Sequence, residues 1–485
     1  MSNITTRFAP SPTGFMHIGS IRTALFAYIY AKKYDGTFIL RIENTDKKRE
    51  VEQALQHITE SLQWLGITWN YGPATPGSFG SCIQSERLDI YRSYAEKLVV
   101  AGYAYPDPYT AEELQTFRIQ AEQAGEHFLY RSIRPDTTKP WDAKTPLRLK
   151  VPEIKRYIWQ DAVRGTLEAG PEMLDDVILM KADGYPTYNF AHIVDDYEMG
   201  VTHVMRGDEF ISSMPKFLSI YDALGISYPT FISLPPILRP DRSKKLGKRD
   251  GAKDILEYRE DGILPETMVN FLAFIGWNPG TDDELFSMSE LIEQFSIDKI
   301  HKSGAVFNEE KLLWMNKQYV QRLNADAFYT YAKNALPSTL YNNVDTNPKP
   351  FQKLLPAIQE RVRTKSDVTE AAREGEYDYL YTAPTLTAEQ LKWKKDPDTS
   401  ALSSRLMALQ TALTASPAFA SPEAVKETVW PLTDTFGTGE VLWPFRISLT
   451  GRERSPDPFI SAYALGKEET LHRLSTALYV VESAR

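Results

Sequence analysis

The chemistry-bearing residues that stand out first lie in residues 10–20, which read Pro-Ser-Pro-Thr-Gly-Phe-Met-His-Ile-Gly-Ser. An apolar stretch precedes this segment, and an amphipathic run follows it as far as Gly36. That order predicts a strand, a tight turn and a helix, whose free backbone N–H groups and positive end can bind a phosphate. His17 can donate to the phosphate, and Gly19, which has no Cβ, lets a purine or ribose approach the backbone. A His-x-Gly step alone is also typical of an ordinary helix cap.

A second group of residues, far along the chain, has complementary chemistry. Between residues 239 and 249 one acid, Asp241, is accompanied by six cations, and Gly247 and Gly251 interrupt and close the run. On charge alone, a solvated basic loop would be the ordinary interpretation. A glycine-containing loop with lysines also suits the stabilisation of a triphosphate during in-line attack, where positioning and electrostatics do most of the work. The cations are Arg239, Arg242, Lys244, Lys245, Lys248 and Arg249.

Together the two segments resemble the paired signatures of class I aminoacyl-tRNA synthetases. In that family a His-Ile-Gly-His-type element holds ATP, and a Lys-Met-Ser-Lys-Ser-type loop stabilises the transition state. Here the two read His17-Ile18-Gly19-Ser20 and Lys245-Leu246-Gly247-Lys248-Arg249. The surrounding motifs narrow the resemblance to glutamyl-tRNA synthetases of bacterial type. They occur in family order over nearly the whole chain, at residues 7–14, 41–46, 185–190, 194–196, 203–209 and 449–451.

The resemblance implies a monomeric glutamate–tRNA ligase that uses ATP and Mg²⁺. Such an enzyme activates L-glutamate to glutamyl-adenylate, releasing diphosphate, and transfers it to the 3′ terminal adenosine of tRNA(Glu), releasing AMP. A non-discriminating enzyme that also glutamylates tRNA(Gln) is the alternative. The motifs are also compatible with a related enzyme that acts on a small molecule or a modified tRNA base, with a glutaminyl-tRNA synthetase, and with an inactive tRNA-binding paralogue.

The same resemblance assigns the site residues. An arginine fork suits the side-chain carboxylate of glutamate, while Glu43 can accept from the ammonium group and Tyr188 can donate from its hydroxyl. His192 stands where the family often has Asn, and it either lines this pocket or is a packing histidine. The catalytic residues are His17, Lys245 and Lys248; those for ATP are Pro10, Ser11, Gly14, His17, Gly19, Ser20, Lys245, Lys248 and Arg249; those for glutamate are Arg7, Ala9, Ser11, Glu43, Tyr188, His192 and Arg206; those for tRNA are Arg452 and Arg454.

Composition favours a cytoplasmic protein without a membrane segment or a structural metal. The 485 residues, 42% of them hydrophobic, predict roughly three or four domains. The longest apolar run, residues 268–277, is too short to cross a bilayer, and the N-terminus lacks the pattern of a secretory leader. The single cysteine, Cys82, and seven scattered histidines offer no disulfide and no metal-ligand spacing. Net charge −9 argues against a general nucleic-acid binder, but not against an RNA enzyme with its cations on one face.

The elements that must position the site residues follow a β-α-β-α pattern from the N-terminus. Residues 37–42 are a short apolar run typical of a buried parallel strand, and residues 51–65 show helical spacing up to Gly66. The pattern predicts an α/β fold with a doubly wound, Rossmann-like nucleotide-binding sheet. Ligands in such sheets bind beyond the carboxyl ends of the strands.

Changes in this alternation of strands and helices predict five segments. Residues 1–84 and 185–236 form the two halves of the catalytic domain, and residues 237–322 form a helical domain with the basic loop, to which the resemblance assigns contacts with the tRNA stem. Residues 85–184 form an inserted α+β domain, which holds the tRNA acceptor end in the resembled family. Residues 323–485 form an all-helical region, to which the resemblance assigns anticodon binding. This last segment disfavours a small-molecule enzyme and a glutaminyl-tRNA synthetase, whose C-terminal half is a β-barrel.

The inserted segment differs from that of many bacterial relatives, which place a zinc knuckle in it. The matching positions here are Asp107 and Tyr109 rather than cysteines. We therefore expect no zinc.

Overall fold

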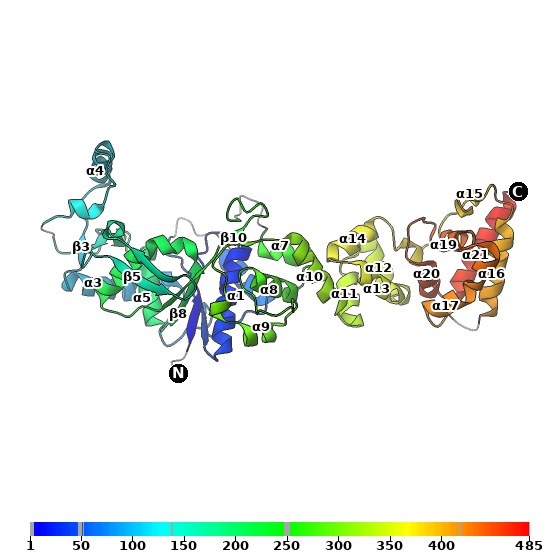
Figure 1. The fold of residues 1–485 in the computed structure, drawn as a ribbon, viewed down its shortest axis with the longest axis horizontal. Helices are drawn as coiled ribbons and strands as arrows, with labels where there is room; N and C mark the ends of the chain where they lie inside the picture. Colours follow the sequence, from blue (N-terminus) through cyan, green and yellow to red (C-terminus); the bar gives the residue numbers. More distant parts are fainter. Residues whose placement is uncertain are drawn as a thin grey trace. The chain divides into compact units, whose positions relative to one another are not determined.

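The computed structural model describes residues 4–46, 51, 53–136, 139–246, 253–416 and 419–484. The chain divides into two compact units (Figure 1). The first comprises Met1–Glu260 and Pro265–Leu312, and the second comprises Asp261–Leu264 and Leu313–Arg485. Within the described residues, no helix combines the length and the apolar character that a membrane crossing requires.

A six-stranded sheet, in the order β2-β1-β8-β9-β5-β6, forms the centre of the first unit. All its neighbouring strands are parallel except β6, which pairs antiparallel with β5. Because helices cover both faces, the strands in the middle of the sheet are apolar and buried, as in other parallel sheets. The strands are β1 (Thr5–Phe8), β2 (Thr37–Leu40), β5 (Tyr157–Asp161), β6 (Gly165–Ala169), β8 (His203–Gly207) and β9 (Thr230–Leu234). The predicted Rossmann-like α/β fold is thus confirmed.

Strand order reverses at β1, which lies between β2 on one side and β8 on the other. The chain passes from β1 through α1 (Ile18–Lys33) to β2, and only much later adds β8 to the opposite edge of β1. Such a reversal opens a crevice beyond the carboxyl ends of the two diverging strands. The residues that follow β1 and β8 are therefore the ones that the fold places at a ligand site.

Helices pack on both sides of this sheet. α1 contacts β1, β2 and β8 through a wide apolar face, and α8 (Pro265–Phe274) and α9 (Met288–Gln294) pack against it. On the other side α3 (Leu88–Val100), α5 (Tyr188–Glu198) and α6 (Met214–Leu224) share one hydrophobic core. The remaining elements of this unit include α2 (Ala54–Trp64), α7 (Ile255–Glu260), β10 (Ile237–Leu238) and β11 (Ala305–Val306).

The predicted insertion, residues 85–184, contains a small antiparallel sheet and one exposed helix. The sheet has the order β3-β4-β7, and the helix α4 has a capping box in which Thr110 and Glu113 bond each other's backbone N–H. The elements are β3 (Ala104–Pro106), β4 (Leu147–Leu149), β7 (Ile178–Met180) and α4 (Ala111–Gln123). Two further strands of this range, β5 and β6, belong to the central sheet instead. The five segment boundaries remain a prediction.

The second unit is helical, and no strand is assigned among its described residues. α10 (Glu309–Gln321) leads into it, and its helices build two hydrophobic cores to which α20 contributes Ala464 and Ala462 respectively. The helices are α11 (Ala325–Lys333), α12 (Ser338–Thr346), α13 (Lys349–Arg361), α14 (Lys365–Arg373), α15 (Ala388–Leu391), α16 (Leu402–Ala415), α17 (Pro422–Val429), α18 (Pro431–Phe436), α19 (Thr438–Thr450), α20 (Pro458–Leu465) and α21 (Lys467–Ser483). The predicted helical C-terminal region is confirmed.

Candidate active site

A cavity of about 1050 Å³ lies where the sheet order reverses. Its walls come from the turn between β1 and α1, from the residues after β2, from the start of α5 and from the residues after β8 and β9. Most of the residues that the sequence assigned to ATP and glutamate meet here. Those lining the cavity are Arg7, Ala9, Pro10, Ser11, Gly14, His17, Gly19, Ser20, Glu43, Tyr188, Arg206 and Lys245.

His17 is the N-cap of α1. Its Nδ1 accepts from the backbone N–H of Gly19 at 3.1 Å, and its Nε2 lies 3.2 Å from the hydroxyl of Ser20. The first turn of α1 contains no acidic residue, so the positive end of the helix is not neutralised there. His17 therefore caps a helix whose N-terminus faces the cavity, and its contact with a phosphate stays a prediction.

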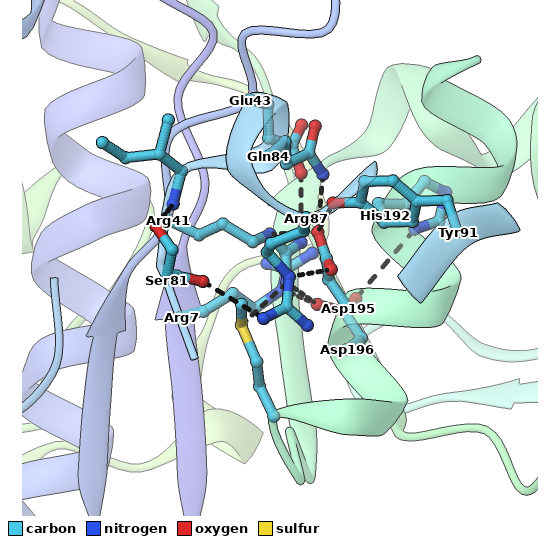
Figure 2. Close-up of polar contacts among 12 residues, drawn as sticks. Arg7, Arg41, Glu43, Ser81, Gln84, Arg87, Tyr91, His192, Asp195 and Asp196 are labelled. Carbon is cyan, nitrogen blue, oxygen red and sulfur yellow. Dashed lines mark hydrogen bonds and ion pairs between the residues drawn. The ribbon is translucent and has the colours of Figure 1, made fainter. Parts of the chain in front are cut away.

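Two arginines share one carboxylate beneath the cavity (Figure 2). Arg7 Nε lies 3.1 Å and Arg41 Nη1 lies 2.7 Å from Asp196 Oδ1. Arg41 also donates through Nη2 to Glu43 Oε1 at 3.0 Å, whereas Arg7 donates through Nη1 to the carbonyl of Met205 at 3.2 Å. Arg41 thus holds Glu43 directly and, through Asp196, helps to hold Arg7.

A second aspartate anchors this network to α3 and the residues before it (Figure 2). Asp195 accepts from Arg87 Nε, from Gln84 Nε2 and from the hydroxyl of Tyr91, each at 2.8 Å. Arg41 Nε lies 3.8 Å from the same carboxylate. Burial opposes the charge on Asp195 and its neighbours, so these short bonds are what make a buried ionised cluster tolerable.

The pKa values of the two carboxylates bonded to Arg41 shift in opposite directions. For Glu43, burial outweighs Arg41 and Arg7 and leaves the pKa above its ordinary value. For Asp196, burial also raises the pKa, but Arg41, Arg7 and the hydrogen bond from Arg41 outweigh it and bring the pKa well below its usual range. An ammonium group arriving at Glu43 would supply the missing compensation.

Arg206 is a buried cation with no carboxylate partner among the described residues. Its guanidinium lies over the rings of Phe210, Phe217 and Phe231, at 5.5, 5.0 and 5.2 Å from their centroids, and Nη2 contacts the sulfur of Met214. Burial, followed by the nearby charge of Arg7, lowers the pKa of Arg206. A buried, unpaired guanidinium that lines a cavity is suited to receive an anion.

Tyr188 lines the cavity, whereas His192, one turn later in α5, does not. The imidazole of His192 packs between the rings of Tyr188 and Phe217, at centroid distances of 4.7 and 4.6 Å. Neither of its ring nitrogens has a hydrogen-bond partner among the described residues, and burial lowers its pKa well below the ordinary value. This position favours the packing alternative and gives no support to a direct contact between His192 and a ligand in the cavity.

The basic segment reaches the cavity at Lys245. Its Nζ lies 2.9 Å from Glu209 Oε1, and both side chains are about half exposed. Burial raises the pKa of Glu209, but the hydrogen bond and charge of Lys245, a backbone hydrogen bond and the nearby His17 together leave the pKa below its ordinary value. Lys248 and Arg249, which the sequence also assigned to ATP, lie outside the described residues.

The two arginines predicted to bind tRNA follow α19 in the second unit and have different surroundings. Arg452 donates through Nη1 to the carbonyl of Glu374 at 2.6 Å, so its guanidinium joins α19 to the end of α14. Arg454 is exposed. The geometry leaves Arg454 the better placed of the two for a ligand in solution.

The sequence interpretation missed two cations of the cavity wall, Arg22 and Lys181. Arg22 projects from α1 and donates to the carbonyls of Ile275 and Pro235, and burial lowers its pKa to about 10. Lys181 donates to the carbonyl of Thr45 at 2.9 Å. Arg22 is visible in the sequence as a charged residue in the first turns of an otherwise apolar helix, which is an unusual place for arginine.

Asp107, predicted to stand where relatives bind zinc, belongs to a polar network instead. It accepts from Arg148 Nε at 2.6 Å, from the hydroxyl of Tyr130, and from the backbone N–H of Tyr109 at 3.1 Å. The guanidinium of Arg148 lies over the Tyr130 ring, 3.4 Å from its centroid. Within the described ranges, no group of three or more His, Cys, Asp or Glu is arranged to hold a metal ion.

Comparisons with known proteins agree with these features. Residues 3–314 match the family model described as the catalytic domain of tRNA synthetases class I (E and Q), and residues 325–478 match an anticodon binding domain. A glutamate–tRNA ligase of Flavobacterium psychrophilum is 36% identical over 98% of this chain and 99% of its own length. One from Moorella thermoacetica is 37% identical over 98% of each chain.

A solved structure extends the similarity to three dimensions. The crystal structure of a glutamate tRNA ligase from Elizabethkingia meningosepticum in complex with its amino acid matches with a TM-score of 0.87 and 35% sequence identity. The match covers 99% of this chain and 100% of that one. The chain therefore belongs to the glutamate–tRNA ligase family of class I aminoacyl-tRNA synthetases.

Proposed function

We propose that this protein is a glutamate–tRNA ligase that works at the cavity described above. One observation supports the assignment of this function to the cavity: two kinds of anion site meet in it. Arg206 offers a buried guanidinium without a carboxylate partner among the described residues, and the N-terminus of α1 with Lys245 offers a positive, accessible wall. The first suits the side-chain carboxylate of L-glutamate, and the second suits the phosphates of ATP.

In the proposed reaction, the α-carboxylate of glutamate attacks the α-phosphorus of ATP, and diphosphate leaves. The 3′ terminal ribose hydroxyl of tRNA(Glu) then attacks the activated carbonyl, and AMP leaves. No side chain acts as nucleophile. Glu43 accepts from the ammonium group, Arg206 and Arg7 face the side-chain carboxylate, and Tyr188 donates from its hydroxyl.

The charge that develops on the phosphates is stabilised by His17, Lys245 and Lys248, because electrostatic stabilisation is the main contribution a protein makes to such transfers. We infer that Mg²⁺ enters with ATP, since it is usually held by substrate phosphates with one or two carboxylates. We also infer that the protein contains no zinc. The network around Asp107 supports this inference, because it occupies the position in question with charge-assisted hydrogen bonds.

The second unit is proposed to read the anticodon, with Arg454 among its contacts, since residues 325–478 match an anticodon binding domain. We further propose a monomer in the cytoplasm, because one chain carries both the catalytic and the anticodon-binding parts and charged tRNA is used there. The alternative substrate tRNA(Gln) finds no support in the two curated relatives, which are named for glutamate.

Aminoacylation of purified tRNA(Glu) and tRNA(Gln) with labelled glutamate tests this function. We expect glutamate to be attached to tRNA(Glu) in an ATP-dependent reaction that forms AMP and diphosphate. Equal charging of tRNA(Gln) would overturn the proposal that the enzyme discriminates between the two tRNAs. Absence of charging with both tRNAs, at Mg²⁺ and ATP concentrations that support other synthetases, would overturn the function itself.

A further inference from the structure

α2 carries a histidine, His57, to which the sequence interpretation gave no role. Its imidazole contacts both the residues that lead into α1 and the residue that precedes α7. Nε2 lies 2.8 Å from Asp254 Oδ1, and the backbone N–H of Met16 faces Nδ1 at an N···N distance of 3.4 Å. The Phe15 ring lies 4.8 Å from the imidazole, measured between centroids. One side chain of α2 therefore contacts two segments that are far apart in the sequence.

These two segments also meet directly. The backbone N–H of Ile255 donates to the carbonyl of Met16 at 3.1 Å, and His17 and Asp254 form an antiparallel bridge. Asp254 also begins α7, since its Oδ1 accepts from the N–H of Leu256 at 2.8 Å. The contact is thus a small built junction, in which His57 supplies the only side chain from α2 that reaches both segments among the contacts of the described residues.

In the sequence, the residues of the junction stand close to both signature segments. Met16 immediately precedes His17, the cap of α1, and Asp254 follows Lys248 by six residues. Nδ1 faces an N–H donor and Nε2 faces a carboxylate, so the tautomer that carries its proton on Nε2 satisfies both contacts. The side chains of His57 and Asp254 are only 13% and 14% exposed, which shields their hydrogen bond from water.

We propose that His57 is a positioning residue for adenylate formation, which fixes the α1 N-terminus relative to Asp254, a residue that follows the basic segment, through its contacts with Met16 and Asp254. The inference rests on the proposed function and assigns His57 no contact with substrate. Misplacement of reacting groups by about 1 Å can cost on the order of 10²-fold in rate. Loss of the junction should therefore slow adenylate formation more than it weakens the binding of ATP or glutamate.

Two conservative substitutions distinguish the contact of His57 with Met16 from its contact with Asp254. In His57→Asn the amide can replace Nδ1 but cannot reach Asp254, whereas in His57→Gln the amide nitrogen can replace Nε2 and donate to Asp254. Adenylate formation is measured in the full chain by rapid quench, with tRNA(Glu) bound and ATP and glutamate saturating. We expect His57→Asn to be slower by roughly 10- to 100-fold, with unchanged KM values and melting temperature, and His57→Gln to stay close to wild type.

A matched control comes from an ion pair between α2 and α7. Arg259 Nη1 lies 2.7 Å from Glu60 Oε1, on side chains that are 37% and 43% exposed. Because that pair joins the same two helices, Arg259→Ala tests whether general packing of α2 on α7 is enough to explain the effect. We expect Arg259→Ala to keep the wild-type rate.

A double-mutant cycle with Lys248→Ala completes the test. If His57 acts by positioning the basic segment, His57→Asn should have little further effect in the Lys248→Ala background. Equal rate losses in both backgrounds, or equal losses in His57→Asn and Arg259→Ala, would overturn the inference while leaving the ligase function intact. A wild-type chain that charges no tRNA would instead overturn the function, and this inference with it.

Discussion

Among single residues, Arg206 offers the most direct test of how glutamate is held, because its buried guanidinium faces the cavity without a carboxylate partner among the described residues. Arg206→Ala should raise the KM for glutamate and lower kcat/KM. The loss of transition-state stabilisation should be about 2–5 kcal/mol, as is typical when one partner of a buried charge pair is removed. The KM for ATP should hardly change. Steady-state kinetics of aminoacylation, with glutamate and ATP varied separately, measure both effects.

Arg206→Lys is the matched control, because it keeps the charge but loses the planar fork. It should recover only part of the activity. Ready activation of glutamine by the wild-type chain would contradict a pocket built around a carboxylate, as would an equal rise in both KM values for Arg206→Ala.

Lys248 tests the transition-state role of the basic segment. Lys248→Ala should lower the rate of adenylate formation by about 10²–10³, or about 2.7–4 kcal/mol, which is the usual cost of losing one electrostatic donor. ATP binding, measured at equilibrium, should change much less, because the charge grows during the reaction. An equal loss of ATP affinity and of rate would mean that Lys248 contributes uniform binding instead.

The buried network beneath the cavity gives a prediction for acid stability. Because Arg41 and Arg7 hold the pKa of Asp196 well below its ordinary value, Asp196 stabilises the fold above its unfolded pKa of about 3.9. That contribution is lost only as the pH falls through the lower, folded pKa. Arg41→Met removes the main compensating charge, so acid unfolding followed by circular dichroism should begin at a higher pH than in wild type.

Arg156→Ala is the control for this experiment, since the pair Arg156–Glu168 is more than half exposed on both sides. Exposed pairs contribute little to stability, so its acid midpoint should stay close to wild type. An unchanged midpoint for Arg41→Met would show that the network does not depend on Arg41.

The residues that line the cavity were easier to predict from the sequence than the residues that support them. Glu43, Tyr188 and Arg206 belong to local motifs, and all three line the cavity. The bonds from Arg41 and Arg7 to Asp196 connect residues more than 150 positions apart, and no local pattern encodes such a pairing. A signal does exist in the sequence, because Arg41 follows an apolar strand, and a cation buried at such a place needs a charged partner.

At the scale of elements, the β1–α1–β2 arrangement could be predicted because buried parallel strands are short apolar runs and their helices have helical spacing. The pairing of β5 with β9 could not be predicted from the sequence. It places residues of the predicted insertion in the central sheet through a contact at Asp161 and Phe231, and neither strand carries a local mark of its neighbour. The helical second unit was predictable, since its proline-broken segments keep a helical period.

The inserted segment offers a prediction about the polar network around Asp107. Asp107 is buried and bonded to Arg148, so Asp107→Ala should destabilise the protein by about 3–5 kcal/mol through an uncompensated buried charge. Urea unfolding measures the effect. Asp107→Asn, which keeps an acceptor for Tyr109 and Tyr130, should cost less.

Elemental analysis of the purified wild-type chain should find no stoichiometric zinc. About one zinc per chain would contradict the proposed absence of a metal. Equal stability of Asp107→Ala and wild type would show that the Asp107–Arg148 pair is not what holds this segment together.

For the whole molecule, the division into two units separates catalysis from the proposed reading of the anticodon. The catalytic family match ends at residue 314 and the anticodon-binding match begins at residue 325, on either side of the end of α10. Residues 261–264 belong to the second unit although they lie within the catalytic match. Asn316 of α10 binds these residues, because it accepts from the N–H of Leu264 and donates to the carbonyl of Gly262.

A chain that ends at residue 322 should therefore keep the cavity and bind ATP, but should no longer distinguish tRNAs by their anticodons. The physical reason is distance: the anticodon lies far from the acceptor end, so the catalytic unit needs a second part of the chain to reach it. Proteins read unstacked anticodon bases by stacking and by contacts to base edges, and the matched anticodon binding domain lies beyond the cut. Aminoacylation of tRNA(Glu) and of anticodon-substituted tRNA(Glu) should differ strongly for the full-length chain and hardly at all for the shortened one. In the full-length chain, Arg454→Ala should raise the KM for tRNA and leave the KM for ATP unchanged. Equal anticodon sensitivity of the two chains would place anticodon recognition outside the second unit.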